Sequence, residues 1–92
     1  MEFKSESGRI WLDDESGNMI AEITYPQVSD DVVNISRTYV SRVLRGQGMA
    51  SKLVQAAVDD IRAKGQKATA GCSYAVSWFE QHPECTDILK SE

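Results

Sequence analysis

Hydrophobic and polar residues alternate over the first half of the chain, and this two-residue period is typical of β-strands. Pro26 ends one of these runs, because proline lacks the N–H that strand pairing needs. Acidic residues with Gly17 and Asn18 indicate a turn at 13–18. We predict four strands in this half, at residues 9–12, 19–25, 32–36 and 38–43.

A helical period follows these strands. Apolar residues recur every fourth position over 49–64, which places them on one face of an amphipathic helix, and Gly65 is a typical residue to follow its end. A short strand at 67–71 is expected next. A second helix is predicted at 74–82, because Pro83 disfavours helical geometry at the residue before it.

The order of these elements indicates an α/β (α+β) fold, with a mostly antiparallel mixed sheet of about five strands and two main helices. A chain of 92 residues that is 41% hydrophobic and 26% charged suits one globular domain, spanning 1–92, with a modest core. No apolar run approaches the about 18 residues that cross a bilayer, and the acidic N-terminus lacks signal-peptide features. We therefore expect a cytoplasmic protein with no membrane partner.

Cysteine and histidine content predicts neither a disulfide scaffold nor a metal site. Cys72 and Cys85 fit no zinc-binding spacing, and His82 is the only histidine, so no metal cofactor is expected. Cys85 is interpreted as structural. Three aromatic residues are predicted members of the core: Trp11, Trp78 and Phe79.

The net charge of −4 is unevenly distributed along the chain. Residues 1–34 carry a net charge of −6 and residues 72–92 a net charge of −3, whereas residues 35–71 carry +5. Nucleic-acid-binding domains are usually basic overall, so the basic middle favours a local anion site and no nucleic-acid partner. Uneven surface charge without a ligand is the alternative interpretation.

The basic middle contains the most informative segment, residues 44–50, where two glycines follow an arginine and precede the first helix. Gly46 and Gly48 allow the backbone to approach a ligand closely, because they carry no Cβ. The first turn of a helix adds unpaired N–H donors and the positive end of the helix dipole. Together with Arg45, these features predict a cradle for pyrophosphate.

The same segment resembles the acyl-CoA-binding signature of the GNAT N-acetyltransferases, R/Q-x-x-G-x-G/A, which residues 45–50 match as Arg-Gly-Gln-Gly-Met-Ala. Cys72-Ser73-Tyr74 and the segment at 78–84 resemble the small, stand-alone branch of predicted acetyltransferases of similar length. The resemblance covers most of the chain. It implies the minimal GNAT fold, with acetyl-CoA as the cosubstrate.

In that family the pantetheine arm of CoA pairs with the fourth strand, and the pyrophosphate meets backbone amides of the glycine loop. The resemblance places a main-chain contact at Val40. Arg45 either contacts phosphate or braces the loop, Arg42 is a nearby cation or a solvated charge, and Gln47 faces solvent. A β-branched residue at either loop glycine should block the ligand. The implied CoA-binding residues are Val40, Arg42, Arg45, Gly46, Gln47, Gly48, Met49 and Ala50.

The catalytic residues are harder to assign. Many GNAT enzymes are thought to use a tyrosine on the second helix as the acid, but Phe79 stands in that place and has no proton to donate. Cys72 is either a nucleophile or proton donor near the thioester, or a small buried residue. Tyr74 is either a second donor or a packed aromatic residue. His82 is either a base or a residue that ends the helix.

These features favour an acetyl-CoA-dependent N-acetyltransferase that acts on an unidentified amine. The main alternative is a CoA-binding sensor or subunit with little or no transferase activity, which Phe79 favours, and a protein-interaction domain is the third. The chain is short for the family. Its acceptor site should therefore be open, or completed by a second copy or another chain, which favours a macromolecular amine.

Overall fold

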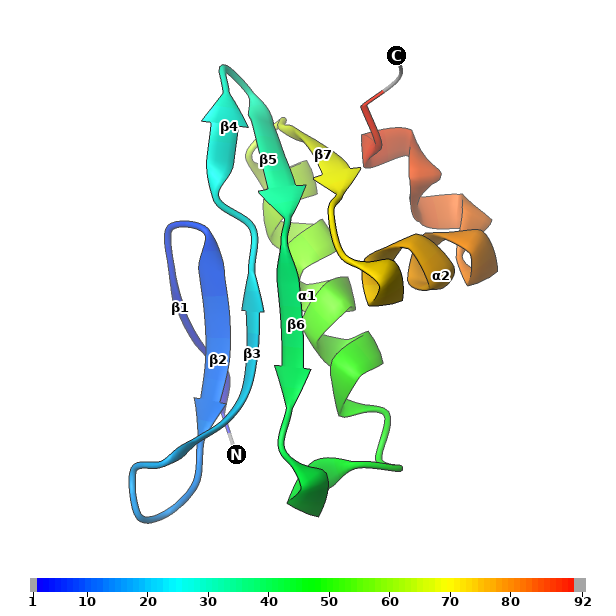
Figure 1. The fold of residues 1–92 in the computed structure, drawn as a ribbon. Helices are drawn as coiled ribbons and strands as arrows, with labels where there is room; N and C mark the ends of the chain where they lie inside the picture. Colours follow the sequence, from blue (N-terminus) through cyan, green and yellow to red (C-terminus); the bar gives the residue numbers. More distant parts are fainter. Residues whose placement is uncertain (1, 91–92) are drawn as a thin grey trace.

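The computed structural model describes residues 2–90, in which seven strands and two α-helices are joined by turns and two 3-10 helices (Figure 1). The elements in chain order are β1 (Lys4–Glu6), β2 (Arg9–Asp13), β3 (Met19–Thr24), β4 (Gln27–Ser29), β5 (Val32–Ile35), β6 (Arg37–Val40), η1 (Arg42–Leu44), α1 (Met49–Ala63), β7 (Lys67–Ala70), α2 (Ser73–Gln81) and η2 (Pro83–Ile88).

The strands form two sheets that share one continuous segment of the chain, residues 32–40. The first sheet has the order β1-β2-β3-β6 and is antiparallel throughout. In the second sheet, β5 lies between β4, its antiparallel neighbour, and β7, its parallel neighbour. β5 continues into β6 across Ser36, so this segment contributes one strand to each sheet (Figure 1). β7 pairs with β5 only, and β6 is left as an edge strand of the first sheet in the described part of the chain.

The predicted α/β class with two main helices is confirmed. The structure adds two three-residue strands, β1 and β4, that the alternation did not reveal. Every residue in both is exposed, so neither strand carries the one-sided apolar pattern by which a sequence indicates a strand.

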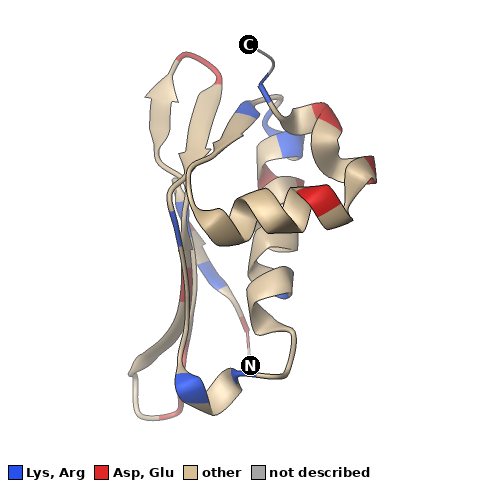
Figure 2. Cartoon of the chain, turned by 45° about the vertical axis from the view of Figure 1, so that its right-hand side comes forward, with Lys and Arg blue, Asp and Glu red and all other residues tan. Residues whose placement is uncertain are grey.

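Helix α1 supplies the centre of the core. Both helices lie on the same side of the four-stranded sheet (Figure 2). The spacing of the apolar residues gives α1 one buried side, which packs on β2, β3 and β6 of that sheet and on α2 and η2. On α2, Trp78 and Phe79 are 3% and 4% exposed, as predicted for core residues. The α1 residues with 0% exposure are Leu53, Val54, Ala57, Val58 and Ile61.

No helix within residues 2–90 has both the length and the apolar character needed to cross a bilayer.

The strand predicted at 38–43 is shorter than expected. β6 ends at Val40, and the chain then turns through η1, with the Leu44 N–H donating to the Ser41 carbonyl oxygen over 2.9 Å. This turn buries Leu44 to 5% exposure and leaves Val43 72% exposed. The apolar character of Val43 therefore reflects neither strand pairing nor core packing.

The prediction that Trp11 belongs to the core was wrong. Ile10 and Leu12 are the buried residues of β2, and successive side chains of a strand point to opposite faces. Trp11 therefore lies on the face away from the helices, where the Arg9 guanidinium sits 4.0 Å from the centre of its ring. That contact shields part of an indole that no helix covers.

Two carboxylates should make the fold sensitive to acid. Backbone N–H groups of Asn18 and Ser16, each 2.9 Å away, hold the pKa of Asp14 below its usual range, with Asn18 the larger cause. Hydrogen bonds from Arg62 of 2.7 and 3.3 Å likewise lower the pKa of Asp87. Both pKa values are lower in the folded protein than in the unfolded chain. The stability they confer is therefore complete above about pH 4 and lost as the pH falls through the folded values.

We expect the free energy of unfolding to fall below about pH 4, and to fall less steeply in Asp14→Asn, because that variant has one carboxylate fewer to protonate. Urea denaturation of both proteins at a series of pH values between neutrality and strong acid measures the two slopes. Identical acid slopes would contradict the prediction.

Candidate functional site

Two glycines with positive φ angles shape the loop between η1 and α1. Gly46 has φ of 84°, and Gly48, the N-cap of α1, has φ of 71° in the left-handed region. Residues with a side chain are strained in that region. A Cβ added at either position would meet no other atom within 4 Å, so both face open space. The backbone conformation already requires glycine, before any ligand is considered.

The first turn of α1 presents N–H groups without partners. The first hydrogen bond of the helix runs from the Lys52 N–H to the Gly48 carbonyl oxygen over 3.1 Å. The N–H groups of Met49, Ala50 and Ser51 bond no acceptor among residues 2–90, and Gly48 has no side chain to cap them. Such groups, at the positive end of the helix dipole, favour an anion.

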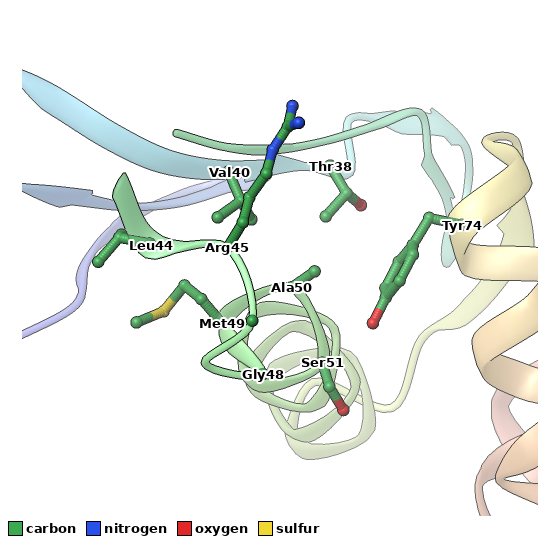
Figure 3. Close-up of a pocket in the computed structure, with 10 residues that line it drawn as sticks. Thr38, Val40, Leu44, Arg45, Gly48, Met49, Ala50, Ser51 and Tyr74 are labelled. Atoms are coloured by element: carbon green, nitrogen blue, oxygen red, sulfur yellow. The ribbon is translucent and has the colours of Figure 1, made fainter. Parts of the chain in front are cut away.

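A pocket of about 370 Å³ lies beside this turn. In Figure 3, Thr38 and Val40 of β6 lie on one side of it, the first turn of α1 lies opposite, and Tyr74 of α2 lies at one end with its hydroxyl directed toward α1. Ten residues line the pocket: Thr38, Val40, Leu44, Arg45, Gly46, Gly48, Met49, Ala50, Ser51 and Tyr74.

Within residues 2–90, nothing pairs with the backbone of β6 along the side of the strand that lies away from β3. Ser41 donates its N–H to the Ile20 carbonyl oxygen over 2.7 Å, and Val40 lies opposite Ala21 in the register. Backbone groups of an antiparallel strand point alternately toward and away from the partner, so those of Thr38 and Val40 point away from β3. These are also the two β6 residues that line the pocket.

Cations surround the glycine loop. Arg42, Arg45 and Lys52 are exposed, and none forms an ion pair with a carboxylate within residues 2–90. By contrast, Arg9 and Arg37 both pair with the buried Glu22 on the opposite sheet face. Figure 2 shows basic residues near η1 and the loop. The loop therefore combines unneutralised positive charge with free N–H groups.

Six of the eight residues predicted to bind the cofactor line this pocket, and two do not. The Arg42 side chain is exposed on η1, beside the pocket rather than in its wall. The Gln47 side chain is exposed and donates to the Val43 carbonyl oxygen over 3.5 Å. The six pocket residues are Val40, Arg45, Gly46, Gly48, Met49 and Ala50.

The three predicted catalytic residues occupy different places. Tyr74 lines the pocket. Cys72 is half-buried and does not line the pocket, but its Sγ lies 3.7 Å from the Oγ1 atom of Thr38, which does. His82 lies outside, stacked on Trp78 at 3.9 Å between ring centroids. Its Nδ1 donates to the Trp78 carbonyl oxygen over 2.7 Å, because a carbonyl can only accept.

Sequence reasoning did not single out two of the residues that line the pocket, Thr38 and Ser51. For both residues, a local feature of the sequence indicates a place beside the predicted ligand site. Thr38 stands two residues before Val40 and so shares its face of the strand. Ser51 is the third residue of α1, within the turn that carries free N–H groups.

Residues 9–88 match the family model described as GCN5-related N-acetyl-transferase. A GCN5-like protein from Staphylococcus aureus has a similar structure, with 34% identity, a TM-score of 0.81, and coverage of 99% of this chain and 89% of the other. No curated protein matches the chain.

Two larger structures share the fold. Escherichia coli YhbS in complex with CoA is 22% identical, with a TM-score of 0.56, over 63% of this chain and 35% of its own. N-acetylglutamate synthase from Neisseria gonorrhoeae, in complex with CoA and N-acetylglutamate, is 19% identical, with a TM-score of 0.61, over 82% of this chain and 18% of its own.

Proposed function

This chain belongs to the GCN5-related N-acetyltransferase family, and we propose that it binds acetyl-CoA and transfers the acetyl group to an amine. The observation that best supports this proposal is that one pocket joins the free backbone edge of β6 to the free N–H groups of α1. Acetyl-CoA has matching parts, since an extended arm with two amides leads from the thioester to a pyrophosphate. The CoA complexes of YhbS and the Neisseria synthase, which share the fold, support the same cosubstrate.

In this proposal each part of the pocket holds one part of the cosubstrate. The backbone groups of Thr38 and Val40 pair with the amides of the pantetheine arm, as a peptide pairs with a sheet edge. The N–H groups of residues 46–51 bind the pyrophosphate, and Arg45 and Arg42 add positive charge. The arm then runs along β6 toward Thr38, which places the thioester near Cys72 and Tyr74.

Acetyl transfer requires proton movements that few nearby residues can perform. The amine nitrogen attacks the thioester carbonyl carbon while the C–S bond breaks, so the amine loses a proton and the CoA thiolate gains one. Phe79 is 4% exposed in the core and has no proton to give. Cys72 is the proposed proton donor, Tyr74 is the competing candidate, and His82 lies away from the pocket.

A CoA-binding protein without efficient transfer is the second candidate function. It is favoured by Phe79, because the position that carries the acid in many relatives is here part of the core. We propose a cytoplasmic location for either activity, since acetyl-CoA is supplied there. The acceptor is an unidentified amine, and the exposure of Tyr74, at 39%, favours a macromolecular one.

The two functions are separated by measuring binding and transfer on the same preparation. Calorimetric titration with acetyl-CoA and with CoA should give micromolar affinity, which corresponds to about −8 kcal/mol. Release of the CoA thiol should then be followed with peptides that present lysine or N-terminal amines. Binding with thiol release supports the transferase, and binding without release from any peptide supports the CoA-binding protein. Absence of binding rejects both.

A further inference from the structure

A hydrogen bond joins the two helices at the wall of the pocket. The indole N–H of Trp78 on α2 donates to the Oγ atom of Ser51 on α1 over 2.9 Å. Trp78 is 3% exposed, whereas Ser51 lines the pocket. The bond therefore connects the protein interior with the surface on which the pyrophosphate is proposed to lie.

This bond determines which role the Ser51 hydroxyl can play. A hydroxyl donates one hydrogen bond and accepts two, whereas an indole N–H only donates. Ser51 must therefore accept from Trp78 and keeps its own proton for another acceptor. Helical serines often give that proton to a carbonyl of the preceding turn, but no such acceptor is bonded here among residues 2–90. The Ser51 proton is thus given to no acceptor within residues 2–90, and Ser51 belongs to the turn of α1 that carries the free N–H groups.

The indole is itself held firmly. The ring of His82 stacks on Trp78 at an interplanar angle of 13°, and His82 Nδ1 bonds the Trp78 carbonyl oxygen. Phe79 meets the same ring edge-on, with 5.3 Å between centroids. These contacts fix the direction of the indole N–H. They also give His82 a structural role near the pocket without contact with it.

We propose that Trp78 is a positioning residue of the CoA site, whose indole N–H holds the Ser51 hydroxyl so that it donates to a pyrophosphate oxygen. The inference rests on the proposed function and adds a side-chain donor to the backbone amides. Without the indole N–H, the Ser51 proton can turn to a carbonyl of its own helix, which competes with the ligand.

A double-mutant cycle on CoA affinity tests the inference. We expect Ser51→Ala to weaken binding about 10-fold and Trp78→Phe about 5-fold, and the double variant to bind no more weakly than Ser51→Ala. Matched controls are Ser77→Ala, at an exposed serine of α2, and Trp11→Phe, on the far sheet face, both within about twofold of wild type. Unchanged affinity of Trp78→Phe, or additive losses in the double variant, overturns the inference. If wild type itself fails to bind CoA, the proposed function fails first.

A spectroscopic measurement keeps the test decisive if Trp78→Phe does not fold. The protein has two tryptophans, so Trp11 provides an internal reference for the indole N–H resonance of Trp78. We expect Ser51→Ala to shift the Trp78 resonance, and CoA to shift it in wild type but not in Ser51→Ala. The phosphorus resonances of the bound pyrophosphate should also differ between these two proteins. A Trp78 resonance that does not respond to saturating CoA overturns the inference.

Discussion

Gly48→Val is expected to weaken CoA binding at least about 100-fold, a loss of about 2.7 kcal/mol or more. Gly48 lines the pocket, and a Cβ added there points into open space that the ligand is proposed to fill. The branched side chain of valine would occupy that space and separate the pyrophosphate from the N–H groups of α1. The same substitution forces a β-branched residue to a φ of 71°, which costs about 1–2 kcal/mol or more of stability.

Gly65→Val separates these two effects. Gly65 follows the other end of α1, has φ of 68°, and would also place its Cβ in open space. It should lose similar stability but keep CoA affinity within about twofold of wild type. Calorimetric titration with CoA, together with thermal denaturation of both variants, gives the comparison. Equal loss of affinity in the two variants would show that strain, rather than contact with the ligand, caused the effect.

The sequence predicted elements whose determinants are local. The helix expected at 49–64 is Met49–Ala63 in the structure, because its apolar period and its flanking glycines are all contained in that segment. The strand expected at 67–71 is Lys67–Ala70. The free N–H groups beside the glycine loop were predictable for the same reason. Gly46, Gly48 and the free turn of α1 lie within a few residues of one another.

Contacts between distant segments could not be predicted in this way. The bond between Trp78 and Ser51 joins residues 27 apart, and the contact between Cys72 and Thr38 joins residues 34 apart. Both contacts depend on how α2 packs against α1 and β6, which no short sequence pattern specifies. The orientation of Trp11 was predictable in principle. Successive side chains of β2 point to opposite faces of the sheet, so Trp11 points away from the face that buries Ile10 and Leu12.

Removal of the Cys72 thiol is expected to slow acetyl transfer at least about 100-fold, the effect of losing a proton donor or nucleophile. The thiol lies 3.7 Å from the Oγ1 atom of Thr38, and Thr38 lines the end of the pocket that the thioester is proposed to reach. Cys72 is outside the pocket wall formed by the glycine loop, so Cys72→Ala should keep CoA affinity within about twofold. Turnover measured by thiol release, with affinity measured by calorimetry, gives both quantities.

Cys85→Ala is the matched control for this change, because Cys85 is 3% exposed in the core and lies outside the pocket. It should lower the melting temperature and leave turnover per folded molecule unchanged. Tyr74→Phe is the competing test, since that hydroxyl faces the pocket, and we expect turnover within about threefold of wild type. If Tyr74→Phe abolishes transfer while Cys72→Ala retains it, the tyrosine is the acid and the thiol is a packing residue. Normal turnover in Cys72→Ala alone is enough to reject the role proposed for the thiol.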